Sequence, residues 1–387
     1  QNPASPYYSP NRVIRLIHRA HQADLNQIIS YFNPLPGSTN ADSTLAFSFK
    51  YSQAHMYSST KPVGITGWFN SIPAGKKTWL TVRNDDYYFM RWGDPDFARA
   101  YLTNLPDLSK IAGFYMGPDG YCWGREFVST EPESPRQQVI DKMWYSFLLW
   151  GRLSYDPTLP NSQFQGILGE CFPQVAGANL TNLFTGWASV SKIFPLLTRF
   201  YWGAADFQWY PEACWNYQGF QTVQDFITPV FDPMPSSQDG DRPLLMSVKQ
   251  YVNGDAANGR LNPEQVADLL QQYADEGLTR IQALSPGTNK ELRLTLGDIK
   301  AMSHLGRYYA EKIRGATDLY RYQSIGLADH YTNARVHLIT ASNHWSQYAA
   351  QWSTQYIGQV LIRQGDGLID IAAIQALALK QAEAGAA

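Results

Sequence analysis

The sequence predicts an α/β fold, the C-terminal half of a (β/α)8 TIM barrel followed by an all-α C-terminal domain. Short apolar runs alternate with helical segments early in the chain, polar residues gather where each run ends, and strand patterns stop near residue 155. We count only about four strand–helix units, whereas a closed barrel of this type needs eight. We therefore expect a half-barrel over residues 1–153 and a helical domain over residues 154–387.

The four expected strands are apolar runs at residues 12–19, 43–51, 77–85 and 110–117. Helical patterns at 22–32, 94–105 and 135–153 alternate with them, as is typical of parallel β/α units. Farther along, apolar residues three and four apart predict helices at 182–203, 262–285, 294–322 and 328–357. Residues 231–243 are expected to form a loop, and the C-terminal tail a fraying helix.

The composition narrows the class of function. A net charge of −2 with 17% charged residues gives no basic field that would attract nucleic acid. Aromatic residues make up 14% of the chain, which suits either a ring-rich core or a carbohydrate cleft. No run is long enough to span a membrane, and the three residues Cys122, Cys171 and Cys214 allow at most one disulfide.

Candidate site residues stand at the carboxyl ends of the expected strands, where a barrel places its active site. Basic residues there would hold an anionic group, Arg by a bidentate contact and Lys as a point charge, and carboxylates would transfer protons. The competing interpretations are local salt bridges, turn chemistry and solvated surface charge. The candidates for catalysis are Asp85, Asp119 and Glu126, and those for substrate binding are His18, Arg19, Lys50, His55, Arg83, Tyr121, Trp123 and Arg125.

Two further acids, Glu170 and Glu212, fall in the helical region, where local pairing is the more frequent role, so we assign them no chemistry. No spacing typical of a metal site is present, and we expect no metal and no other cofactor.

Over residues 12–160 the chain resembles the glycoside hydrolase family 67 α-glucuronidases. The similar stretches are RVIRLIHRAH, YFNPLPG, LAFSFKYSQAHMYSSTKP, WLTVRNDD, IAGFYMGPDGYCWG and YSFLLWGRLSYDPTLP, in the same order and at similar spacing. The resemblance implies a metal-free enzyme that removes glucuronic acid side groups from xylan-derived oligosaccharides with inversion.

The resemblance also assigns roles to single residues. Arg19 and Lys50 fall where the family holds the uronate carboxylate, and Asp85 falls where it has one of its two candidate bases, a Glu. The other candidate base, an Asp, is replaced by His55. The family's general acid is expected upstream of Gln1, and GPDGYCWGREF is richer in charge than the family's equivalent loop.

We therefore predict a secreted or periplasmic glycoside hydrolase, acting on an oligosaccharide or polysaccharide that carries a uronic acid or another anionic sugar. One alternative is a non-catalytic sugar-binding protein on a degenerate barrel, favoured by His55. Another is a polysaccharide lyase with His18 or His55 as base. An N-terminal half-barrel segment or partner chain and a homodimer are the expected protein partners, with no nucleic acid and no membrane span.

Overall fold

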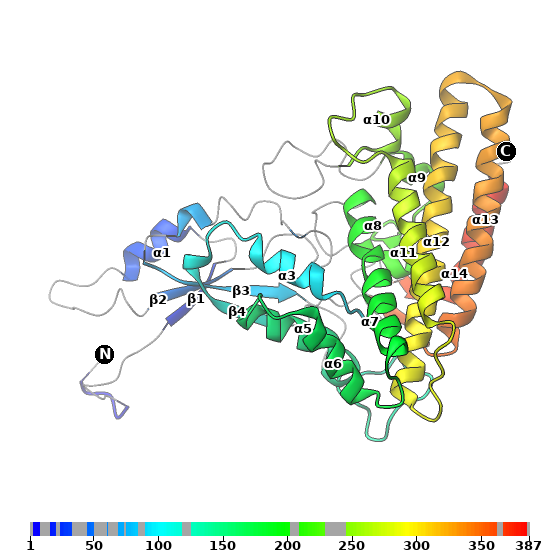
Figure 1. Cartoon of the computed structure of the whole chain (residues 1–387). Helices are drawn as coiled ribbons and strands as arrows, with labels where there is room; N and C mark the ends of the chain where they lie inside the picture. Colours follow the sequence, from blue (N-terminus) through cyan, green and yellow to red (C-terminus); the bar gives the residue numbers. More distant parts are fainter. Residues whose placement is uncertain are drawn as a thin grey trace.

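The computed structural model describes residues 3–7, 16–20, 24–32, 45–49, 60, 69–72, 75–83, 90–117, 125–201, 209–228, 245–361 and 367–384. Within them, four parallel strands in the order β1-β2-β3-β4 form one sheet: Leu16–Ala20, Leu45–Phe49, Thr78–Arg83 and Ile111–Gly117. A long helical region follows, and Figure 1 shows it standing beside the sheet. The predicted fold class, a partial barrel followed by a helical domain, is confirmed.

The helices of the barrel half are α1 (Leu25–Phe32), α3 (Pro95–Thr103), η1 (Leu108–Lys110), α4 (Val139–Lys142) and α5 (Trp144–Tyr155). Those that follow are α6 (Asn161–Cys171), α7 (Ala178–Ser191), α8 (Ile193–Tyr201), η2 (Pro211–Ala213), α9 (Val223–Ile227), α10 (Val248–Val252), α11 (Pro263–Ile281), α12 (Lys290–Ile325), α13 (Ala328–Ser353) and α14 (Ile371–Ala384). The boundary that the sequence suggests between residues 153 and 154 stays a prediction.

Local sequence explains where several helices begin and end. Asn262 caps α11 by accepting a hydrogen bond from the Gln265 backbone, with Pro263 at the first helical position. At the other end of α12, Gly326 ends the helix with φ 70°, a left-handed conformation that a glycine adopts without steric cost. The chain then reverses into α13 (Figure 1).

The helical region also contains short strands that the sequence pattern did not predict. They form a three-stranded antiparallel sheet of β5 (Trp209–Tyr210), β6 (Trp215–Asn216) and β7 (Gly219–Phe220), and a hairpin of β8 (Gln359–Leu361) and β9 (Gly367–Ile369). Runs of two or three residues are too short to show the alternation from which a strand is predicted. The predicted loop at 231–243 lies outside the described residues.

The interface between α12 and α13 pairs acids on one helix with histidines on the other. His330 Nδ1 lies 3.0 Å from Asp318 Oδ1, and His337 Nδ1 lies 2.7 Å from Glu311 Oε2. Burial would raise the pKa of Glu311, but its contacts with His337 and Arg314 lower it overall. These polar contacts fix how the two antiparallel helices lie against each other.

His304, on α12, is the buried member of this interface, with 8% of its surface exposed. No protein group that the structure describes hydrogen-bonds its Nδ1. Burial lowers the pKa of His304 to about 4, and the positive charges of Arg307 and Lys300 act in the same direction. The neutral form of this imidazole is therefore the form that the folded protein prefers.

We expect His304 to make the protein less stable as the pH falls from 7 to 5. In this window the unfolded histidine binds a proton and the folded one does not, which lowers the free energy of unfolding by about 2 kcal/mol. Urea unfolding at the two pH values measures the loss. In His304→Gln the decrease in the free energy of unfolding between pH 7 and pH 5 should be smaller by about 2 kcal/mol, because glutamine does not titrate. Equal pH dependence in the two proteins would contradict the assignment.

Candidate active site

The carboxyl ends of the four parallel strands bring Arg19, Ser48 and Tyr115 together. Arg19 pairs with Ser48 in register, and Tyr115 lies on β4. The Arg19 guanidinium donates from Nη1 to the Tyr115 hydroxyl oxygen, which lies 2.8 Å from Ser48 Oγ. One face of the sheet therefore carries a cation held beside two hydroxyl groups, a suitable arrangement for an anionic, hydroxyl-rich ligand.

His18 lies on the opposite face from Arg19, because successive side chains of a strand alternate. It pairs in register with Phe47, which is fully buried in the hydrophobic core. His18 Nε2 is buried and has no hydrogen-bond partner in the described part of the chain. The two neighbouring candidates are thus separated by the sheet, which gives no support to His18 as the base of a lyase.

Glu126 and Arg125 lie beyond β4 and make local contacts. The Glu126 side chain is buried, accepts a hydrogen bond of 2.9 Å from the Val128 backbone and lies 3.8 Å from Lys142 Nζ. Arg125 is exposed and donates to the Arg136 carbonyl. These are the surroundings of a structural ion pair and a surface residue, and the roles expected of Glu126 and Arg125 stay predictions.

Other candidates fall where the structure describes no side chain. The backbone of Arg83 ends β3 and pairs with Gly117 of β4, which places it at the same strand-end edge as Arg19. The candidates outside the described residues are Asp85, Asp119, Lys50, His55, Tyr121 and Trp123.

Residues 90–94, directly before α3, form a buried segment that contacts the helical region, and we call this segment the strap. All five residues are buried. The Met90 N–H donates to Glu212 Oε1 at 3.0 Å, and the Arg91 N–H donates to Asp298 Oδ2 at 3.0 Å. Two buried carboxylates from distant parts of the chain thus hold consecutive backbone amides.

Side chains of α7 complete the hold on the strap. Trp187 Nε1 donates to the Arg91 carbonyl at 3.0 Å, and the Gly93 N–H donates to Ser191 Oγ at 2.8 Å. Trp92 Nε1 donates in turn to the Ser191 carbonyl at 2.9 Å. The backbone of the strap is therefore fixed by side chains of the helical region.

The Arg91 side chain enters a buried polar network. Its Nη1 lies 3.0 Å from Asp298 Oδ2, and its Nε lies 2.7 Å from Glu291 Oε1. Burial alone would lower the pKa of Arg91, but Asp298, Tyr356 and Glu291 raise it overall. Gln355 and Tyr356 both donate to Asp298 Oδ1 at 2.7 Å, so each oxygen of this carboxylate is satisfied.

Asp94 ends the strap as the N-cap of α3. Its Oδ1 accepts hydrogen bonds from the backbone N–H groups of Asp96 and Phe97. Burial raises the pKa of Asp94 to about 6, against the opposing effect of Lys192 and the capping hydrogen bonds. Asp94 is a structural cap, which shows that a carboxylate with a shifted pKa need not be catalytic.

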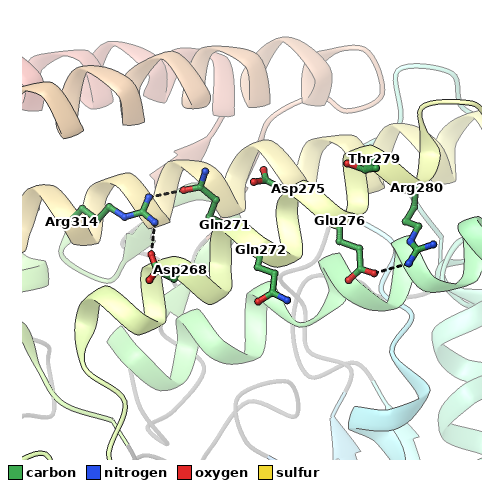
Figure 2. A pocket seen from close by; sticks show the side chains of 8 residues that line it. All are labelled: Asp268, Gln271, Gln272, Asp275, Glu276, Thr279, Arg280 and Arg314. Atoms are coloured by element: carbon green, nitrogen blue, oxygen red, sulfur yellow. Dashed lines mark hydrogen bonds and ion pairs between the residues drawn. The ribbon is translucent and has the colours of Figure 1, made fainter.

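Two cavities lie away from the carboxyl ends of the strands. One, of about 580 Å³, is lined by the start of β4 and by Trp79, Phe114 and Tyr155 among others, at the end of the sheet opposite to the expected site. The other, of about 680 Å³, lies along α11 and is lined by polar residues. Figure 2 shows Arg314 reaching Asp268 and Gln271 there, and Glu276 paired with Arg280.

In the described residues, no three His, Cys, Asp or Glu side chains converge as a metal ion would require. Likewise, no described helix combines the length and the apolar character needed to cross a membrane. Cys171 is exposed and Cys214 is buried, and both are free thiols.

The sequence matches no protein-family model and no curated protein. Among solved structures, the chain is similar to a GH138 enzyme targeting pectin rhamnogalacturonan II, with a TM-score of 0.75 at 13% sequence identity. The match covers 97% of this chain and 56% of that one. The half-barrel and the helical region therefore recur together, as one arrangement, within a solved carbohydrate-active enzyme.

Proposed function

We propose that this chain is part of a glycoside hydrolase that acts on an anionic oligosaccharide or polysaccharide. The observation that carries the proposal is the Arg19–Tyr115–Ser48 cluster at the carboxyl ends of parallel strands. A carboxylate on a sugar would accept hydrogen bonds from the arginine, and hydroxyl groups would exchange hydrogen bonds with the tyrosine and serine. The similar GH138 enzyme targets pectin rhamnogalacturonan II, which supports a polysaccharide as the class of substrate.

Within this class we propose an α-glucuronidase-like, inverting reaction on a uronic acid residue. The support comes from the ordered resemblance to family 67 over residues 12–160. Asp85 would act as the base that activates water, and Arg19 with Lys50 would hold the uronate. In an inverting enzyme the acid and the base lie roughly 6.5–9.5 Å apart, with the water between the base and the sugar. We also propose a secreted or periplasmic location, where such polysaccharides are met.

The test is a product assay on the purified protein. Pectin oligosaccharides and glucuronic-acid-substituted xylan oligosaccharides are offered separately, and the released sugar is identified by chromatography and its anomer by NMR. Release of a uronic acid with inverted configuration is the expected result. An unsaturated product that absorbs in the ultraviolet would instead identify a lyase. Saturable binding by calorimetry without any product would identify a sugar-binding protein.

Arg19 provides a more specific prediction for the same site. Arg19→Ala should raise KM for an anionic oligosaccharide by about 10- to 100-fold, since it removes a charge-assisted contact. KM for the methyl-esterified, neutral form of the same oligosaccharide should change little. Arg19→Lys keeps the charge but loses the planar guanidinium. Its KM for the anionic oligosaccharide should lie between those of the unsubstituted protein and Arg19→Ala. An equal loss on both oligosaccharides would contradict a role in carboxylate binding.

A further inference from the structure

Cys214 and Lys312 form a buried pair of nucleophiles outside the candidate active site. Both residues are completely buried, and Lys312 Nζ lies 3.3 Å from Cys214 Sγ. Cys214 follows η2 in the small antiparallel sheet, and Lys312 lies in the middle of α12, 98 positions along the chain. The pair therefore joins two elements that are distant in sequence.

The surroundings of Lys312 are apolar for a charged amine. Phe220 and Phe226 present ring centroids 4.8 Å and 4.9 Å from Nζ. Nζ also contacts the Gln221 carbonyl and lies 2.9 Å from the Tyr308 hydroxyl oxygen. Asp225 acts on Lys312 through its negative charge, but in the part of the chain that the structure describes no ion pair joins the two.

Burial without an ion-pair partner favours the neutral, nucleophilic form of a lysine. Burial lowers the pKa of Lys312, while Cys214 and the negative charge of Asp225 oppose that shift. A neutral amine keeps a lone pair that can form a bond, which an ammonium does not.

The backbone of Cys214 gives an independent reason to look for a role of its side chain. This residue has φ 51° and ψ 44°, the left-handed region. Glycine and asparagine are the usual residues there, and other side chains cost roughly 1 kcal/mol or more. A cysteine at such a position, with its sulfur 3.3 Å from a lysine amine, points to a use of the thiol.

We propose that Cys214 and Lys312 are a modification site, in which oxidation by hydrogen peroxide links Sγ to Nζ as a sulfenamide. In the first step the sulfur attacks one peroxide oxygen, the O–O bond breaks, and Cys214 becomes a sulfenic acid as one water leaves. In the second step the amine of Lys312 attacks that sulfur and the S–O bond breaks. The hydroxyl group then leaves with one amine proton as a second water.

The overall change consumes one thiol, one amine and one hydrogen peroxide, and gives one S–N bond and two waters. The sulfur is oxidised by two electrons and the peroxide is reduced by two. A thiol reductant reverses the link by attacking the sulfur.

The experiment treats the purified protein with hydrogen peroxide and maps its tryptic peptides by mass spectrometry. The expected result is a joined pair of peptides from around Cys214 and Lys312, lighter than their sum by two hydrogen atoms and uncleaved after Lys312. A thiol reductant should restore both peptides. Cys171, which is exposed, is the internal control and should form no such link.

The link should also raise the Tm by about 5 °C or more, because a bond between residues 98 apart restricts the unfolded chain. In Lys312→Met, which keeps the apolar volume, oxidised Cys214 should proceed to the sulfinic acid and the Tm should not rise. Sulfinic acid at Cys214 of the unsubstituted protein, with Lys312 still cleaved by trypsin, would overturn the proposal. So would a Cys214 that stays reduced under conditions that oxidise Cys171.

Discussion

Asp298→Ala is expected to lower the free energy of unfolding by about 3–5 kcal/mol, because it removes the fully buried carboxylate that Arg91 contacts and leaves the guanidinium to the partly exposed Glu291. The Asp298 side chain has no exposed surface, and it accepts hydrogen bonds from Arg91, Gln355 and Tyr356. The replacement therefore removes all of these at once. Urea or guanidinium unfolding, followed by a probe of helix content, measures the loss.

Two further variants make this prediction specific. Asp275→Asn breaks an ion pair with Arg307 in which the aspartate side chain is 44% exposed, and it should cost about 1 kcal/mol or less. Arg91→Met combined with Asp298→Leu removes both charges, and it should be much less destabilising than Asp298→Ala alone. If the double variant were as unstable as the single one, the cost would come from packing and not from an unpaired charge.

Asp85→Asn should lower kcat by about 10²- to 10⁴-fold while KM changes little, if Asp85 is the base of the proposed reaction. An asparagine is close in shape but cannot take a proton from water. The neighbouring Asp86→Asn is the matched control, because it removes the same charge one position along the chain. Steady-state kinetics on the anionic substrate measures both.

The pH profile separates a catalytic base from a residue with a structural role. Loss of the acidic limb of kcat/KM in Asp85→Asn, with that limb retained in Asp86→Asn, is the signature of a base. A large loss in Asp86→Asn and none in Asp85→Asn would contradict the assignment made from the resemblance to family 67.

The sequence was informative about the barrel half because strand patterns there are periodic and strand ends are polar. It placed Arg19 at the edge where the structure has it. Ser48 and Tyr115 were missed, since one polar residue inside an apolar strand gives no signal until the register is known. The separation of His18 from Arg19 did follow from side-chain alternation and could have been predicted.

The partners of the strap could not have been predicted from the sequence. Glu212 holds Met90 across 122 positions, and Asp298 holds Arg91 across 207 positions. Each looks locally like an ordinary acid among helical residues, and nothing in a window of neighbouring residues shows that it faces a distant backbone amide. Glu212 was assigned no chemistry from its neighbours in sequence, and the structure shows it as a buried anchor of the strap.

The length of these connections has a consequence for synthesis of the protein. A ribosome that adds about 5–20 residues each second emits Arg91 roughly 10–40 s before Asp298. During that interval the strap has neither the Asp298 carboxylate nor α12 to cover it, so its apolar surface is open to other chains. Nascent barrel halves of this kind are therefore candidates for chaperone binding, and their fate depends on how quickly the distant helices follow.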